Sequence, residues 1–260
     1  MEPGLRTPLL DSFRRPDVAR DVRLAAAQGQ LAPRGEEQAA LLMLLARDPD
    51  AEVAATAEHT IQSIPAASLS ALLARPDLSA DVREFLTARG VTPATGVPVD
   101  GPLVDTATVS ADDEADAAPP AEGEERPSVL QKIQALNVAG RMVLAMKGTR
   151  EERSILIRDP NKLVSTAVLS SPKINESEVE SIAKMANVSE EILRLIAMSR
   201  AWTKSYAIVH ALVRNPKTPV AISMNLLSRL VDKDLRMLST NRNVPEILRV
   251  TARKKIVIQR

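Results

Sequence analysis

The strongest constraint on the fold of this chain is a short polar motif that recurs at a constant interval in its C-terminal part. The motif starts at residues 158, 186, 214 and 242 and reads Arg-Asp-Pro, Ala-Asn-Val, Arg-Asn-Pro and Arg-Asn-Val. Six and ten residues after each start stand two apolar residues, which are Val164 and Val168, Ile192 and Ile196, Val220 and Met224, and Leu248 and Ala252. Apolar residues at i and i+4 mark the buried face of a helix, so each unit is expected to hold two short helices and two turns.

The stretch RNPKTPVAI, residues 214–222, shows how one helix of a unit ends and the next begins. Pro216 pushes Asn215 out of the helical region of backbone space, which ends the first helix. Thr218 is expected to cap the second helix and Pro219 to occupy its first turn. Asn175 and Glu178 match a capping box in the same way.

The N-terminal part repeats as well. Residues 15–23 and 75–83 share the pattern Arg-Pro-Asp followed by Asp-Val-Arg, and residues 47–53 match residues 158–164. A period of 20–50 residues is typical of solenoids, in which each unit buries its apolar face against its neighbours. The fold class predicted is all-α, an α-solenoid of short helical-pair repeats with a period of about 28 residues in the C-terminal part.

Composition supports helices and excludes several kinds of site. Hydrophobic residues make up 45% of the chain but aromatic residues only 2%, a mixture that favours close packing of helices. There is no cysteine, which excludes disulfides, thiolate chemistry and cysteine-ligated zinc. The longest apolar run, Ala39–Ala46, is far shorter than the roughly 18 residues of a membrane span. We expect a soluble, cytoplasmic protein without a signal peptide.

Two helical parts are expected to flank a disordered acidic linker at residues 90–128, which is rich in Pro, Gly, Ala and acids. The predicted organisation is a helical repeat domain at 1–89, this linker, and a basic solenoid domain at 129–260. Residues 1–126 hold 11 arginines, no lysine and 22 acids, for a net charge of −11. Residues 127–260 hold 23 basic and 11 acidic residues, for a net charge of +12, so the two parts differ sharply in charge.

Several turn sequences of the two helical parts resemble those of known helical-repeat families. The stretches RDPDAEVAATA (47–57) and RPDLSADVREFL (75–86) resemble the inter-helix turn and second helix of HEAT-like repeats. The motifs NPKTP and NRNVPEILR resemble the units of bacterial α-solenoids of the leucine-rich-repeat-variant type. The resemblance covers both helical parts and omits the linker. It implies a HEAT-like domain at 1–89, and a protein whose surface binds partners, since such solenoids act only occasionally as enzymes.

The repeated motif also supplies candidate binding residues. Its central residues, Asp159, Asn187, Asn215 and Asn243, are expected to form a line and to bond the turn backbone. The arginines beside them, Arg158, Arg214 and Arg242, are expected to form a parallel row. This row has two interpretations, a solvated set of charges near helix C-termini or a basic stripe that binds an anionic partner. Lys217 joins the row as a candidate.

Trp202 and Tyr206 are the only aromatic residues of the C-terminal part. They stand four residues apart on a predicted helix, so they share a face. With the neighbouring Arg200 and Lys204 they form a candidate anchor for a partner, because Trp, Tyr and Arg are common in interface hot spots. The alternative is that the two rings fill a gap in the core.

Three functions remain open. The first is a non-catalytic scaffold or adaptor whose basic repeat surface binds an acidic protein, or the chain's own acidic linker. The second is a solenoid that contacts the phosphates of DNA or RNA. The third is an enzyme of the HEAT-like DNA glycosylase type, although no catalytic motif is present. His59 and His210 stand in separate parts of the chain and are expected to be helix-packing or surface residues. We expect no catalytic residue, no cofactor and no metal.

Overall fold

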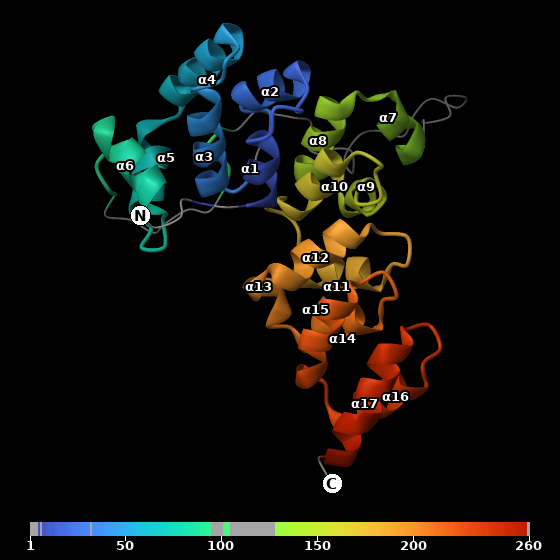
Figure 1. Cartoon of the computed structure of the whole chain (residues 1–260). Coiled ribbons are helices and arrows are strands. Elements are labelled where there is room, and N and C mark those ends of the chain that lie inside the picture. Colours follow the sequence, from blue (N-terminus) through green and yellow to red (C-terminus); the bar gives the residue numbers. More distant parts are fainter. Residues whose placement is uncertain (1–4, 6, 32, 95–100, 105–127, 259–260) are drawn as a thin grey trace, which may run out of the picture. The chain divides into compact units, whose positions relative to one another are not determined.

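The computed structural model describes residues 5, 7–31, 33–94, 101–104 and 128–258 (Figure 1). Within these residues all regular secondary structure is helical, which confirms the all-α prediction. The chain forms two compact units, Met1–Lys173 (unit 1) and Ile174–Arg260 (unit 2). The division expected from the sequence falls elsewhere, at 1–89, 90–128 and 129–260, and stays a prediction.

Unit 1 combines helices from both sides of the expected linker. Its helices are α1 (Pro8–Phe13), α2 (Arg20–Ala27), α3 (Gly35–Leu45), α4 (Ala51–Ser63), α5 (Ala66–Leu73), α6 (Ala80–Ala88), α7 (Val129–Ala135), α8 (Val138–Lys147), α9 (Arg150–Leu156) and α10 (Lys162–Leu169). Consecutive helices pack on one another, as in α3 on α4 and α8 on α9. In addition α1 packs on α10 and α2 on α8, so the N-terminal helices contact those that follow residue 128 (Figure 1).

The same turn occurs twice in unit 1. Five residues connect α3 to α4, and five connect α9 to α10. The third residue of each turn is an aspartate, Asp48 or Asp159, whose Oδ1 accepts from the backbone N–H two residues later, at 2.9 and 2.8 Å. Each aspartate also binds an arginine of a preceding helix, Arg23 at 2.6 Å and Arg141 at 2.7 Å. The predicted match between residues 47–53 and 158–164 is therefore confirmed.

Part of the expected linker is packed against unit 1. Leu103 is buried, and its backbone N–H donates to Oε1 of Gln38 at 2.6 Å. The N–H of Val104 donates to the same oxygen, and the Val104 side chain lies against Gly29, which has a φ of 74°. The expected disorder is therefore wrong for residues 101–104. Leu103 and Val104 pack on unit 1, although the composition of the surrounding stretch as a whole predicts no packing. Residues 95–100 and 105–127 of the expected linker lie outside the described residues.

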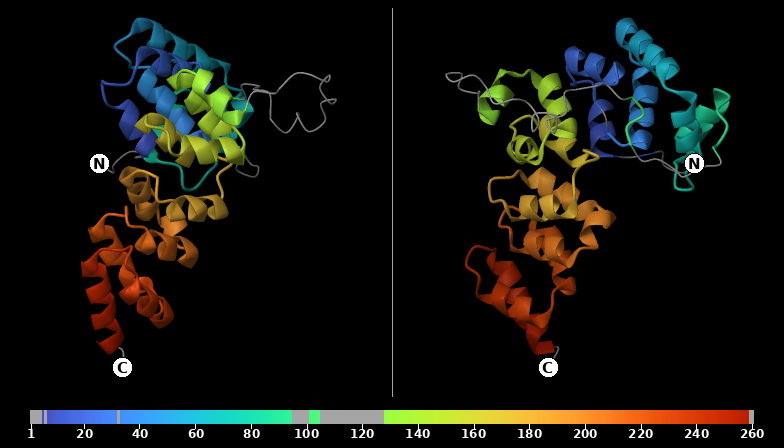
Figure 2. Two further views of the ribbon diagram at one scale, coloured as in Figure 1. Left: turned by 90° about the vertical axis from the view of Figure 1, so that its right-hand side faces the viewer. Right: turned by 180° about the vertical axis from the view of Figure 1, so that it is seen from behind.

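Unit 2 is a succession of helix pairs. Its helices are α11 (Glu176–Lys184), α12 (Glu190–Met198), the short α13 (Arg200–Thr203), α14 (Tyr206–Arg214), α15 (Val220–Leu226) with the 3-10 helix η2 (Leu227–Arg229), α16 (Asp232–Thr240) and α17 (Glu246–Ile258). The contacts of α11 with α14, of α14 with α15, of α15 with α17 and of α16 with α17 join the pairs into one stack. Helices α16 and α17 lie side by side in both views of Figure 2. This arrangement fits the predicted solenoid. The predicted capping box of Asn175 and Glu178 is present at the start of α11.

Each pair in unit 2 is closed by a five-residue turn, at residues 185–189, 215–219 and 241–245. The fourth residue of each turn is buried, with Val188, Thr218 and Val244 at 0%, 3% and 3% exposure. It stands two residues before the next helix, where an apolar side chain packs against the first turn of that helix. The predicted cap at Thr218 is wrong, since its side chain makes no cap hydrogen bond and Pro219 occupies the cap position.

The interval between pairs is not constant, in contrast to the expected regular period. Helices α12, α15 and α17 start at residues 190, 220 and 246, so the first interval is longer than the second. The four-residue helix α13 lengthens the connection that precedes the second of these pairs. The constant 28-residue step therefore falls two residues too early in that pair: Arg214 is the last residue of α14, whereas Arg242 is the second residue of its turn. Arg214 and Asn215 are thus not structurally equivalent to Arg242 and Asn243. The predicted ladder and the predicted arginine row are both wrong at this point.

Unit 1 contains a buried carboxyl group that makes its stability depend on pH. Glu37 accepts hydrogen bonds from the hydroxyls of Thr7 and Ser170, and burial raises the pKa of Glu37 to about 6. Its ordinary pKa is 4.5, so the folded state binds the proton more tightly than the unfolded state. The free energy of unfolding is therefore expected to fall as pH rises from about 4.5 to about 6.

We predict that Glu37→Gln stabilises the chain by about 1–2 kcal/mol at pH 7, because the amide carries no charge to desolvate. Near pH 4, where the glutamate is protonated, variant and wild type are expected to unfold at similar denaturant concentrations. Urea unfolding of both proteins at the two pH values measures the difference. A stability difference that does not change with pH would contradict the prediction.

The hydroxyl of Thr218 suggests a second stability test. Its Oγ1 is buried and has no hydrogen-bond partner among the described residues, whereas the equivalent positions hold Val188 and Val244. Thr218→Val should stabilise unit 2 by about 1 kcal/mol, since it removes an unsatisfied buried hydroxyl at nearly constant volume. Thermal unfolding tests this, with Val188→Thr as the reverse change, which should destabilise. A lower melting temperature for Thr218→Val would show that the hydroxyl is bonded in solution.

Candidate functional site: a basic hollow in unit 2

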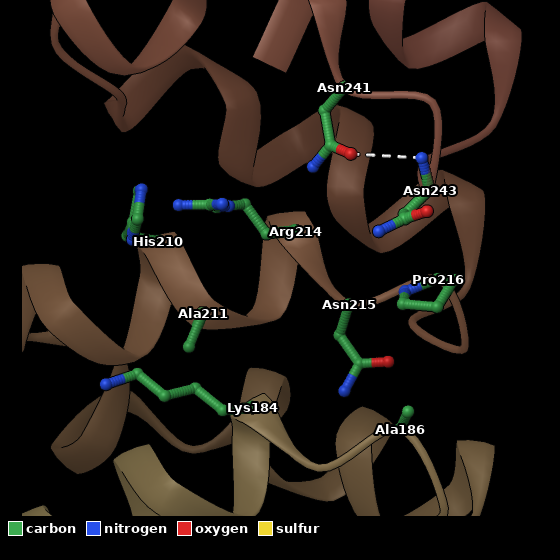
Figure 3. A pocket seen from close by; sticks show the side chains of 9 residues that line it. All are labelled: Lys184, Ala186, His210, Ala211, Arg214, Asn215, Pro216, Asn241 and Asn243. Carbon is green, nitrogen blue, oxygen red and sulfur yellow. Dashed lines mark hydrogen bonds between the residues drawn. The ribbon is translucent and has the colours of Figure 1, made fainter. Parts of the chain in front are cut away.

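The turns of unit 2 enclose a surface hollow with a volume of about 600 Å³. This is within the range of ligand sites, roughly 300–1,000 Å³. Helices α11 and α14 and the three five-residue turns contribute the residues that line it (Figure 3), which are Lys184, Ala186, His210, Ala211, Arg214, Asn215, Pro216, Asn241 and Asn243.

The lining residues occupy equivalent positions in successive pairs. Lys184 and Arg214 are each the last residue of the first helix of a pair. Asn215 and Asn241 are each the first residue of the turn that follows, and Ala186 and Pro216 are each the second. The hollow is therefore produced by the repeat itself, since the same part of three neighbouring pairs faces it.

The charged side chains at the hollow are basic. None of the described residues that line it is acidic. Arg214 is exposed and has no hydrogen-bond or ion-pair partner in the described part of the chain, while Lys184 pairs with Glu180 on its own helix. Lys217 and Arg242 are exposed and directly adjoin the lining residues Pro216, Asn241 and Asn243 in the chain. As far as the described residues show, the hollow thus has a positive surface on which Arg214 is free to bind an anion.

His210 completes one side of the hollow. Its Nε2 is buried, lacks a hydrogen-bond partner among the described residues and lies 3.7 Å from Oδ1 of Asp234. Its ring stacks on Tyr206 with the centroids 6.2 Å apart. The imidazole is therefore held in place by a stacked ring and a nearby carboxylate.

The asparagines of the hollow fall into two classes. The Asn215 amide is fully used: Nδ2 donates to the carbonyls of Ala183 and Met185 at 2.8 and 2.9 Å, and Oδ1 accepts from the N–H of Lys217 at 3.0 Å. The expected backbone bonding is thus confirmed for this residue. Oδ1 of Asn241 accepts from the N–H of Asn243 at 3.0 Å. Nδ2 of Asn241 and the whole Asn243 amide have no hydrogen-bond partner among the described residues.

The aromatic candidates Trp202 and Tyr206 do not line the hollow, although Tyr206 stacks on the lining residue His210. Trp202 is half-buried in α13, and Tyr206 begins α14, so the single helix predicted for them is wrong: the chain breaks it at Lys204 and Ser205. The Tyr206 hydroxyl donates to Asp234 and accepts from the N–H of Val231 at 3.2 Å. Burial and then this bond to Asp234 raise the pKa of Tyr206. Tyr206 thus ties α14 to the start of α16, and its role in binding stays a prediction, as does that of Trp202 and Lys204.

Arg158 belongs to unit 1, where it is exposed and its Nε donates to the Ser154 carbonyl at 3.1 Å. Of the seven predicted candidates, Arg214 lines the hollow, and Lys217 and Arg242 adjoin it. Sequence reasoning missed Lys184, His210 and Asn241. Lys184 is the last residue of a first helix and Asn241 is the first residue of a turn, positions that become visible only when residues are counted from helix ends.

The described part of the chain contains neither a grouped metal site nor a membrane-spanning helix. Among the described residues, no three His, Asp or Glu side chains are grouped so as to hold a metal ion. No helix in the described part of the chain has the length and apolar character needed to cross a membrane. No known protein family, no curated protein and no solved structure matches this chain.

The two classes of asparagine predict different mutational effects. Asn215→Ala leaves two buried carbonyls and one N–H without their side-chain partner, and should destabilise unit 2 by about 2–3 kcal/mol. Asn243→Ala removes an exposed amide that bonds nothing and should change stability by less than about 0.5 kcal/mol. Urea unfolding of the two variants measures the contrast, and equal destabilisation would refute the division into structural and unpaired amides.

Proposed function

We propose that the protein is a non-catalytic interaction module, built as an α-solenoid of HEAT-like or leucine-rich-repeat-variant type, that binds an acidic segment of another protein. The hollow of unit 2 is the proposed site. The observation that carries this proposal is the guanidinium of Arg214, which has no partner among the described residues. It lies in a hollow whose described lining consists of basic, amide and small apolar residues and contains no acid. An exposed guanidinium without a protein acceptor is hydrated by water and can exchange that water for a bidentate ion pair with an external carboxylate.

The charge of unit 2 supports an anionic partner. Residues 174–260 hold 15 basic and 8 acidic residues, a net charge of +7. A positive field around the hollow accelerates encounter with an acidic protein and disfavours basic ones. The lack of cysteine suits a reducing compartment, so we place the interaction in the cytoplasm.

Nucleic acid is the second candidate, because the exposed Lys217 and Arg242 at the edge of the hollow are suited to contact phosphates. Among the described residues, His210 is the one aromatic side chain that lines the hollow, and its ring is already stacked on Tyr206, which leaves little for bases to stack on. The acidic protein segment is therefore the better fit.

We predict that Arg214→Glu weakens the binding of a fluorescein-labelled peptide of alternating Glu and Gly residues at least about tenfold. The matched control is Arg229→Glu, which makes the same charge change at an exposed arginine of η2 outside the hollow and should weaken binding only about twofold. Fluorescence anisotropy at ~50 and ~200 mM salt gives both affinities. Equal losses in the two variants would show that net charge alone attracts the peptide.

A further inference from the structure

We infer that the acidic segment is bound in an extended conformation, with a carboxylate at one end of the hollow and its main chain on asparagine amides at the other. This inference rests on the proposed function and specifies its ligand. It is based on two kinds of group that lie at different ends of the hollow: the guanidinium of Arg214, and the amides of Asn241 and Asn243.

The hollow has a cationic end and an amide end. Figure 3 shows the side-chain nitrogens of Lys184, His210 and Arg214 directed to one side, and the amides of Asn241 and Asn243 on the other. A compact anion would use the cationic end alone and leave the amides empty. A ligand that satisfies both ends must extend across the turns, from the end of α14 to the turn after α16.

The cationic end suits a carboxylate. The guanidinium of Arg214 presents two parallel N–H groups that match the two oxygens of a carboxylate, and no protein acceptor occupies them in the described residues. Lys184 is partly neutralised by Glu180, so Arg214 supplies the main contact. One glutamate or aspartate of the ligand is enough to fill this end.

The amide end suits a peptide main chain. An asparagine amide carries both donors and an acceptor, and a peptide group offers the complementary pair. Asn243 has both functions unpaired, and Asn241 has its Nδ2 unpaired while its Oδ1 is held by the turn. Acidic side chains and phosphates offer only acceptors at neutral pH, so they cannot donate a hydrogen bond to the exposed Asn243 oxygen. The N–H groups of a main chain satisfy it.

The test uses the full-length chain and two probes of equal length and charge. One is the Glu-Gly peptide above, and the other is its depsipeptide analogue, in which ester oxygens replace alternate backbone N–H groups. The double variant Asn241→Ser, Asn243→Ala removes the unpaired amides, and the serine hydroxyl can still accept the bond that closes the turn. Thermal unfolding confirms that the variant remains folded.

The wild type is expected to bind the peptide about tenfold more tightly than the depsipeptide, and the double variant to bind the two equally. If Arg214→Glu abolishes peptide binding but ester replacement has no effect, the main-chain contact is refuted and the proposed function stands. If neither probe binds wild type, or if single-stranded DNA of equal charge binds more tightly than the peptide, the proposed function fails and this inference with it.

Discussion

The structure depends on a turn of five residues that joins the two helices of a pair. In unit 2 the fourth residue of the turn is buried beneath the start of the next helix, as Val188 and Val244 show. A short connection with one buried anchor leaves little freedom, so each turn places its other residues in the same way. The last helix residue and the first turn residues of successive pairs consequently gather at one surface, and this repetition produces the hollow.

The third residue of the turn explains why the two units differ in charge at this surface. In unit 1 it is Asp48 or Asp159, and the carboxylate binds an arginine from a preceding helix. The side chains of Asp48 and Asp159 are only 7% and 4% exposed, so both carboxylates are buried within the turn and their ion pairs stabilise it. In unit 2 the third residue is Asn187, Lys217 or Asn243. Without a carboxylate at that position, Arg214 has no ion-pair partner among the described residues, although Lys184 still pairs with Glu180.

The sequence alone predicted the helical class, the pairing of short helices and the kinship of residues 47–53 and 158–164, because apolar spacing and turn residues are local signals. It misplaced Arg214 and Asn215, because a fixed interval cannot anticipate the four-residue helix α13. It also missed the packing of Leu103 on unit 1, which depends on a single side chain rather than on average composition. The hollow itself joins residues that are far apart in the chain, from Lys184 to Asn243, and such proximity follows only from the stacking of helix pairs.

The most direct measurement is a map of amide chemical shifts in the isotopically labelled full-length chain, recorded during titration with the Glu-Gly peptide. If the hollow is the binding site, the saturable shifts will gather in residues 184–186, 210–216 and 241–243, including the side-chain amides of Asn241 and Asn243. Those shifts should weaken as salt is raised, since the contact with Arg214 is electrostatic. Saturable shifts centred on any other surface, with these residues unchanged, would contradict the assignment of the site.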